Sequence, residues 1–78
     1  MPRYFFHIRD GWDFVPDEEG MEFPNINMAE VEGYASARDL SAAALAEGRT
    51  LGACAMEVTD SAGRVLSRIK VAPIYQVA

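Results

Sequence analysis

Apolar and polar residues alternate along the first ten positions of the chain, which is the pattern of a β-strand with one face in a core. Tyr4, Phe6 and Ile8 share the face that can close a core. The opposite face is cationic and aromatic, and its members are Arg3, Phe5, His7 and Arg9. A core does not accept such a row, so we expect it to face water, a partner or another part of the chain.

Turn residues divide the region that follows. Asp10 and Gly11 end the first strand, and residues 12–15 return antiparallel to it before Pro16 stops the pairing. Residues 17–20, with the sequence Asp-Glu-Glu-Gly, predict a solvated acidic turn. A short extended piece over residues 21–23 then ends at Pro24.

The periodicity changes to that of a helix after Pro24. Asn27 and Glu30 form a variant of the capping box, and Gly48 supplies a left-handed stop, which together predict a helix from Met28 to Glu47. A helical wheel places the larger apolar residues on one side, which we expect to pack on the sheet: Met28, Val31, Tyr34, Ala35, Ala42, Leu45 and Ala46. Arg38 falls inside this stripe, so its guanidinium either reaches the edge or pairs with a carboxylate.

Small residues recur on the other side of this helix, in a stripe made of Gly33, Ala37, Leu40 and Ala44. Small side chains let a second backbone approach closely, so the stripe is a candidate contact for a partner helix. The alternative is that alanine, the best helix former, simply occurs on an exposed side.

Alternation returns in the C-terminal third of the chain. Over residues 53–59 the inward positions are Cys54, Met56 and Val58, and residues 60–63 have the length and closing glycine of a hairpin loop. In the strand from Arg64 to Val71, one face consists of Val65, Ser67, Ile69 and Val71. The other face carries Arg64, Leu66, Arg68 and Lys70. Pro73 ends the strand, and residues 74–77 either add a short edge strand or dangle.

These elements predict an α+β fold, a small antiparallel sheet of two hairpins packed on one long helix in the order β-β-(β)-α-β-β. The 78 residues make a single domain, 1–78. Six residues on inward positions should form a nearly buried core: Phe6, Ile8, Val31, Leu45, Val58 and Ile69. One helix covers one sheet face, so the other stays open as a candidate interaction face of Arg3, Phe5, His7, Arg9, Arg64, Arg68 and Lys70, with five of the chain's seven basic residues.

The composition of the chain narrows the range of functions that it can have. A net charge of −5 argues against a generic polyanion binder, although it averages over surfaces of different sign. The single cysteine, Cys54, forms no internal disulfide and is best interpreted as a small buried hydrophobe. No run of about 18 apolar residues and no cationic leader occurs, so we expect a cytoplasmic protein without a membrane span.

Motifs for catalysis are missing. His7 has no nucleophile motif around it, and the acidic residues of positions 10–19 lack the ligand spacing of an EF-hand. Neither GxGxxG nor GxxxxGK[ST] occurs. We therefore expect a non-enzyme with no catalytic residue, no metal and no cofactor.

Several segments resemble an uncharacterised family of very short bacterial proteins. They are the opening Met1-Pro2-Arg3-Tyr4-Phe5-Phe6-His7, the Asp10-Gly11 pair, the Asp-Glu-Glu-Gly turn at 17–20 and the closing stretch of residues 57–66, Glu-Val-Thr-Asp-Ser-Ala-Gly-Arg-Val-Leu. The resemblance covers nearly the whole chain. It implies a small α+β domain that stands alone, and it carries over no catalytic residue.

Two hypotheses of different classes follow. The first is a protein-interaction module that associates with itself through the open sheet face, an unpaired strand edge or the small-residue helix stripe. The second is a single-stranded nucleic-acid binder in which Phe5 and His7 stack on bases while the basic residues meet phosphates. In the alternative to both, the arginines of a solvated face pair with cross-strand carboxylates such as Glu57.

Overall fold

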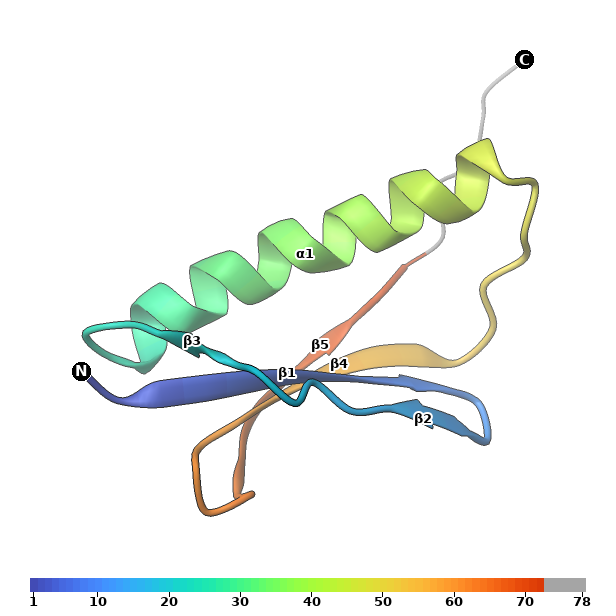
Figure 1. The fold of residues 1–78 in the computed structure, drawn as a ribbon. Helices are drawn as coiled ribbons and strands as arrows, with labels where there is room; N and C mark the ends of the chain where they lie inside the picture. The colour runs from blue at the N-terminus through green and yellow to red at the C-terminus, as the bar shows by residue number, and fades with distance from the viewer. Residues whose placement is uncertain (73–78) are drawn as a thin grey trace.

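The computed structural model describes residues 1–72 and contains five strands and one helix (Figure 1). In chain order they are β1 (Arg3–Asp10), β2 (Asp13–Val15), β3 (Met21–Glu22), α1 (Ile26–Ala46), β4 (Cys54–Thr59) and β5 (Val65–Lys70). This confirms the predicted α+β fold class and the order of its elements. The two alternatives for residues 74–77 lie outside the described residues.

The sheet is antiparallel throughout and has the strand order β2-β1-β4-β5. The long strand β1 pairs with β2 at its C-terminal end and with β3 at Arg3 and Tyr4. Its other neighbour is β4, in a register that sets Phe6 opposite Val58. Because β4 lies between β1 and β5, the basic residues of the two hairpins stand on opposite sides of a central strand.

Helix α1 runs diagonally above one face of the sheet (Figure 1) and turns a different side toward it than the wheel predicted. Its buried residues are small: Ala29, Gly33, Ala37, Ser41 and Ala44. Val31 and Tyr34, expected on the sheet, are 64% and 58% exposed. The reason is close approach, since a Cβ atom on Gly33 would lie only 2.6 Å from the Cδ1 atom of Ile69.

The small-residue stripe therefore packs on the chain's own sheet, and its predicted role as a partner contact is wrong. Gly33, Ala37 and Ala44 are buried, and Leu40 packs against the core. Size selects the buried side here, because only small side chains fit between a helix and a sheet in close contact. Most of the large apolar side chains of α1 therefore point away from the sheet: Met28, Val31, Tyr34 and Leu45.

The helix begins two residues earlier than predicted. Asn25 is the N-cap, and its side-chain oxygen accepts the amide of Met28 at 3.0 Å. Glu30 makes no capping box and instead accepts a hydrogen bond from the Ser67 hydroxyl at 3.1 Å. At the other end Gly48 has a φ of 68° and stops the helix as expected.

The core combines the inward faces of the strands with the small side of α1. It contains Tyr4, Ala29, Ala37, Cys54, Met56, Val58, Ile69 and Val71. Of the six predicted core residues, Val58 and Ile69 are confirmed as buried, Phe6 and Ile8 are half-buried, and Val31 and Leu45 are wrong because they lie on the outer side of α1. Within residues 1–72 no helix has the length and apolar character needed to cross a membrane.

Candidate functional site

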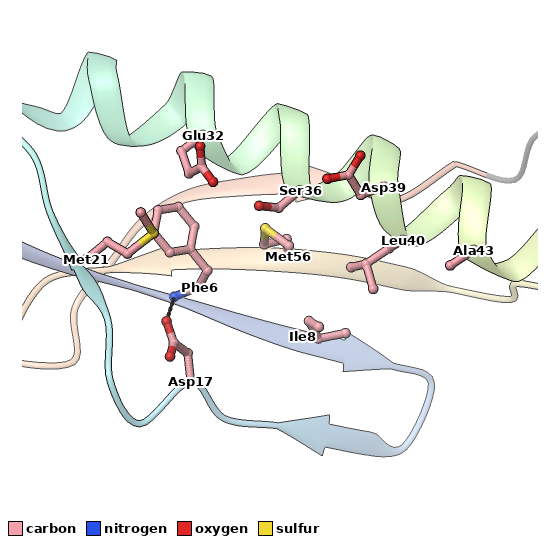
Figure 2. Close-up of a pocket in the computed structure, with 10 residues that line it drawn as sticks. All are labelled: Phe6, Ile8, Asp17, Met21, Glu32, Ser36, Asp39, Leu40, Ala43 and Met56. Atoms are coloured by element: carbon pink, nitrogen blue, oxygen red, sulfur yellow. Dashed lines mark hydrogen bonds between the residues drawn. The ribbon is translucent and has the colours of Figure 1, made fainter.

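An apolar groove opens between α1 and β1 because the helix packs on β4 and β5 and leaves the inner side of β1 partly uncovered (Figure 2). Its volume is about 500 Å³. Phe6 and Ile8 form the strand wall, and Met56 lies between them and the helix. Its other lining residues are Asp17, Met21, Glu32, Ser36, Asp39, Leu40 and Ala43. We call this cavity the α1–β1 groove.

The three charged residues that line the α1–β1 groove are all acidic. Glu32 and Asp39 project from α1, and Asp17 lies across from them beside Phe6 (Figure 2). Since all three carry the same sign, the groove has an apolar floor and a negative rim.

Asp17 holds together the bend between β2 and β3. Its Oδ2 atom accepts the amide of Phe6 at 3.1 Å, and its Oδ1 atom accepts the amides of Glu19 at 3.2 Å and Gly20 at 3.1 Å. Burial acts to raise the pKa of the Asp17 carboxyl, but these amide hydrogen bonds outweigh it and hold the pKa below its ordinary value. The carboxylate is thus charged at neutral pH. The predicted solvated turn is exposed at Glu18 and Glu19, and Asp17 ties it to β1.

Sequence reasoning missed Asp17 as an organising residue, although a signal was present. Gly20 follows it by three positions and has a φ of 68°, where a Cβ atom would lie 2.7 Å from the backbone oxygen of Tyr4. An aspartate followed by such a glycine is typical of a tight side-chain-capped turn. The acidic composition of residues 17–19 obscured this signal.

The sheet face opposite α1, here the outer sheet face, carries the predicted basic residues, but carboxylates neutralise most of them. Glu57 on β4 is buried and accepts hydrogen bonds through Oε2 from Arg9 Nε at 3.0 Å and Arg68 at 2.7 Å. Two further ion pairs join a nitrogen of Arg3 to Glu22 at 3.8 Å and a nitrogen of Arg64 to Asp60 at 3.1 Å. Lys70 is exposed and lies opposite Ala55 in the sheet register. This arrangement matches the alternative in which cross-strand carboxylates pair with the arginines.

Aromatic residues cover the β1 side of the outer sheet face. The rings of Phe5 and His7 stack with centroids 6.3 Å apart, and Phe14 lies 5.4 Å from His7. The guanidinium of Arg9 sits 4.5 Å above the Phe14 ring.

Both nitrogens of His7 are engaged in structural contacts. Nδ1 accepts the amide of Asp17 at 2.9 Å, and Nε2 lies 3.2 Å from the hydroxyl of Thr59. An imidazole held in this way fixes the bend on the sheet and is poorly placed to act as a general base.

Acid should destabilise the fold through Glu57. Burial acts to raise the pKa of its carboxyl, but the hydrogen bonds and charges of Arg68 and Arg9 outweigh burial and lower the pKa. A pKa lower in the folded than in the unfolded state stabilises the protein above about pH 4.3, the unfolded value, and this stabilisation is lost as the pH falls through the folded value. We expect the melting temperature to decrease as the pH is lowered below about 4.3. The decrease should be smaller in the Glu57→Gln variant. An equal fall in both proteins would contradict a role for Glu57.

Comparison with known proteins places the fold in a family without an assigned activity. Residues 3–72 match the family model described as Domain of unknown function (DUF6894). No curated protein and no solved structure matches the chain. Within residues 1–72, no three His, Cys, Asp or Glu side chains are grouped so as to hold a metal ion.

Proposed function

The chain belongs to the DUF6894 family, and from this premise we propose that it is a non-catalytic protein-interaction module that associates with itself through the outer side of α1. The observation that carries the proposal is an apolar stripe on that side, interrupted by Arg38 near its middle. Its members are Met28, Val31, Tyr34, Ala35, Ala42 and Leu45, and all of them are exposed. We call this set the outer stripe.

The outer stripe is unusual for so small a protein. Met28 is 49% exposed and Leu45 is 41% exposed, while the fully buried residues of α1 are alanine, glycine and serine, and Ile26 and Leu40 pack only partly against the core. A helix normally turns its large apolar residues toward a core. Since those of α1 face away from the sheet, a second apolar surface would have to cover them, and contiguous exposed apolar patches mark interaction sites.

A second copy of the same helix fits the outer stripe. If two α1 helices pack antiparallel about a two-fold axis near the helix centre, Met28 meets Leu45, Val31 meets Ala42, and Ala35 meets Arg38 of the partner helix. Met28, Val31 and Leu45 then face an apolar end residue or an alanine. Tyr34 faces Asp39 of the partner helix, and the long side chain of Arg38 can reach the edge of the interface. This alternation of large and small residues is what close helix packing requires, and a two-fold interface uses the same patch on both copies.

The proposed interface predicts a dimer that one charge disrupts. We expect light scattering to give twice the 8.6 kDa chain mass at micromolar concentration, and the Val31→Glu variant to give 8.6 kDa. Burying a carboxylate at the centre of an apolar interface is strongly unfavourable. Val65→Glu is the matched control, because Val65 is 46% exposed on β5, and it should remain dimeric. A wild-type mass of 8.6 kDa at several hundred micromolar would exclude self-association.

The antiparallel register has its own test. Cys54 is buried, so cysteines introduced on the outer stripe are the ones expected to cross-link. The Val31→Cys, Ala42→Cys double variant should form a covalent dimer on mild oxidation, whereas Val31→Cys alone should cross-link poorly. If Val31→Cys alone cross-links as well as the double variant, the proposed antiparallel register is wrong, and the two copies pack in a different arrangement.

A second candidate function is single-stranded nucleic-acid binding through the outer sheet face. The aromatic row of Phe5, His7 and Phe14 with Arg9 beside it favours this function, because bases stack on such rows. The pairing of Arg9 and Arg68 with Glu57 opposes it, since phosphates would compete with a buried carboxylate. We therefore rank nucleic-acid binding below self-association.

Titration of labelled single-stranded oligonucleotides at several salt concentrations tests the second candidate. A binder with four phosphate contacts should show a log–log salt slope near −3, and Phe5→Ala should weaken binding by about 1–3 kcal/mol without changing that slope. Arg9→Ala should reduce the slope by about one. We expect no binding even at low salt. That result would indicate that the residues of the outer sheet face stabilise the fold and do not bind nucleic acid.

A further inference from the structure

We propose that the α1–β1 groove binds an extended segment of another protein in which apolar side chains are flanked by lysine or arginine. The proposal does not rest on self-association, because the groove and the outer stripe share no residue. It rests on the shape of the groove, its apolar wall and the sign and spacing of its charges.

The apolar wall is a piece of core surface that the chain does not cover. Phe6 and Ile8 point toward the helix side of the sheet but are only half-buried, because α1 packs over β4 and β5 (Figure 2). Met21 and Leu40 extend the wall on either side. A cavity of about 500 Å³ is within the range of ligand sites in proteins and has room for apolar side chains to enter.

The charges select a cationic occupant. Glu32 and Asp39 lie seven residues apart on one helix, which corresponds to about 10 Å along its axis. In a peptide with the polyproline II conformation, which has three residues per turn and rises about 3.1 Å per residue, side chains three positions apart point to the same side and lie about 9 Å from one another. A segment with the pattern basic–apolar–apolar–basic can therefore reach both carboxylates while its central side chains meet Phe6 and Ile8.

The opposite wall has the same sign. Asp17 is ionised at neutral pH because three backbone amides stabilise its charge, and no lysine or arginine of residues 1–72 lines the groove. A cationic segment is attracted by all three carboxylates, while an acidic one is repelled by all three. This charge complementarity favours a basic partner and disfavours an acidic one.

A second copy of the chain is a weaker occupant. Among residues 1–72, Arg38 and Lys70 are exposed basic residues outside the ion pairs, but they lie on α1 and β5 and do not belong to one extended segment. Arg3, Arg9, Arg64 and Arg68 are already in ion pairs with carboxylates of their own chain. Entering the groove would require breaking those pairs. A partner with unpaired basic residues has no such cost.

The test is a selection of random twelve-residue peptides on the intact protein, followed by fluorescence anisotropy of the enriched peptides. We expect enriched sequences with two basic residues three positions apart and apolar residues between them. Replacing the basic residues of such a peptide by glutamate should abolish binding. Enrichment of acidic or uniformly polar sequences, or no enrichment, would overturn the proposal.

Variants of the protein locate the bound peptide. The Glu32→Lys, Asp39→Lys double variant should lower affinity at least tenfold, with a smaller loss at high salt because surface charges are screened. Ala43→Phe adds a ring at an exposed helix position of the groove and should block binding. Glu47→Lys, a charge change at the helix C-cap outside the groove, is the matched control and should bind like the wild type.

Two results would overturn the proposal even if peptides bind. Unchanged affinity in both groove variants would place the peptide elsewhere. If the groove variants instead change the mass in light scattering while Val31→Glu does not, the occupant is a second copy of this chain. The circular dichroism spectrum of each variant establishes that it is folded before affinity is measured.

Discussion

Replacing Gly33 with leucine should strongly lower the free energy of unfolding. Gly33 is the point of closest approach between α1 and the sheet, where a Cβ atom would lie 2.6 Å from Cδ1 of Ile69 and 3.4 Å from Cγ2 of Val58. A leucine would have to push the helix off the sheet. Overpacking costs about 1–3 kcal/mol and occasionally more, a large fraction of the ~4–12 kcal/mol expected for a domain of this length. Urea denaturation followed by circular dichroism measures the loss.

A double-mutant cycle identifies the contact. Gly33→Ala gains about 1 kcal/mol of helix propensity but brings its methyl group against Ile69. Ile69→Val removes the Cδ1 atom that this methyl would meet. The cost of Ile69→Val should therefore be smaller in the Gly33→Ala background than in the wild type. Additive effects, or a Gly33→Leu variant as stable as the wild type, would show that the helix does not approach the sheet this closely.

The strands were predictable because their pattern depends on local geometry. Successive side chains of a strand point to opposite faces, so the alternation at Tyr4, Phe6 and Ile8 and at Cys54, Met56 and Val58 defines which face is buried. One correct position fixes the others in the same strand as far as the next irregularity. In β5 the bulge opposite Val58 and Thr59 breaks the phase, so the prediction that Val65 shares the face of Ile69 and Val71 is wrong, and Val65 is 46% exposed. The helix end at Gly48 was also predictable, since a left-handed residue there is a local requirement.

The buried side of α1 was not predictable from hydrophobicity, since it depends on how closely two elements approach. The wheel ranks Val31 and Leu45 above Gly33 and Ala37, and in a helix packed at ordinary distance that ranking holds. Here close approach to Ile69 reverses it. Both the apolar stripe and the small-residue stripe of this helix are visible in the sequence. The structure buries the small-residue stripe and exposes the apolar one, which is the reverse of the predicted assignment.

The α1–β1 groove could not be predicted for a related reason. Its residues come from β1, the bend before β3, the helix and β4, and they meet only because α1 sits over β4 and β5. Strand order decides this, and the sequence left strand order open. The pairing of Arg9 and Arg68 with Glu57 was visible as an alternative, because cross-strand pairs follow from the phase of the strands.

Among the polar residues of the bend between β2 and β3, Asp17 is the one whose replacement with alanine should lower the free energy of unfolding most. Its carboxylate accepts three backbone amides, and hydrogen bonds to charged groups contribute about 1.5–3 kcal/mol each. Water can replace part of this loss, so we expect a cost of about 2–4 kcal/mol in urea denaturation. Asp17→Asn keeps an acceptor oxygen and should lose less.

The matched control for Asp17→Ala is Asp13→Ala, the same substitution at an exposed position of β2. It should change stability by less than about 0.5 kcal/mol, as surface changes away from special features do. Because Gly20 precedes Met21 in the groove wall, Asp17→Ala should also weaken binding of the selected cationic peptides in protein that is still folded. Equal stability of the two alanine variants would mean that residues 17–20 are the solvated turn that their composition suggests, and that the groove wall does not depend on them.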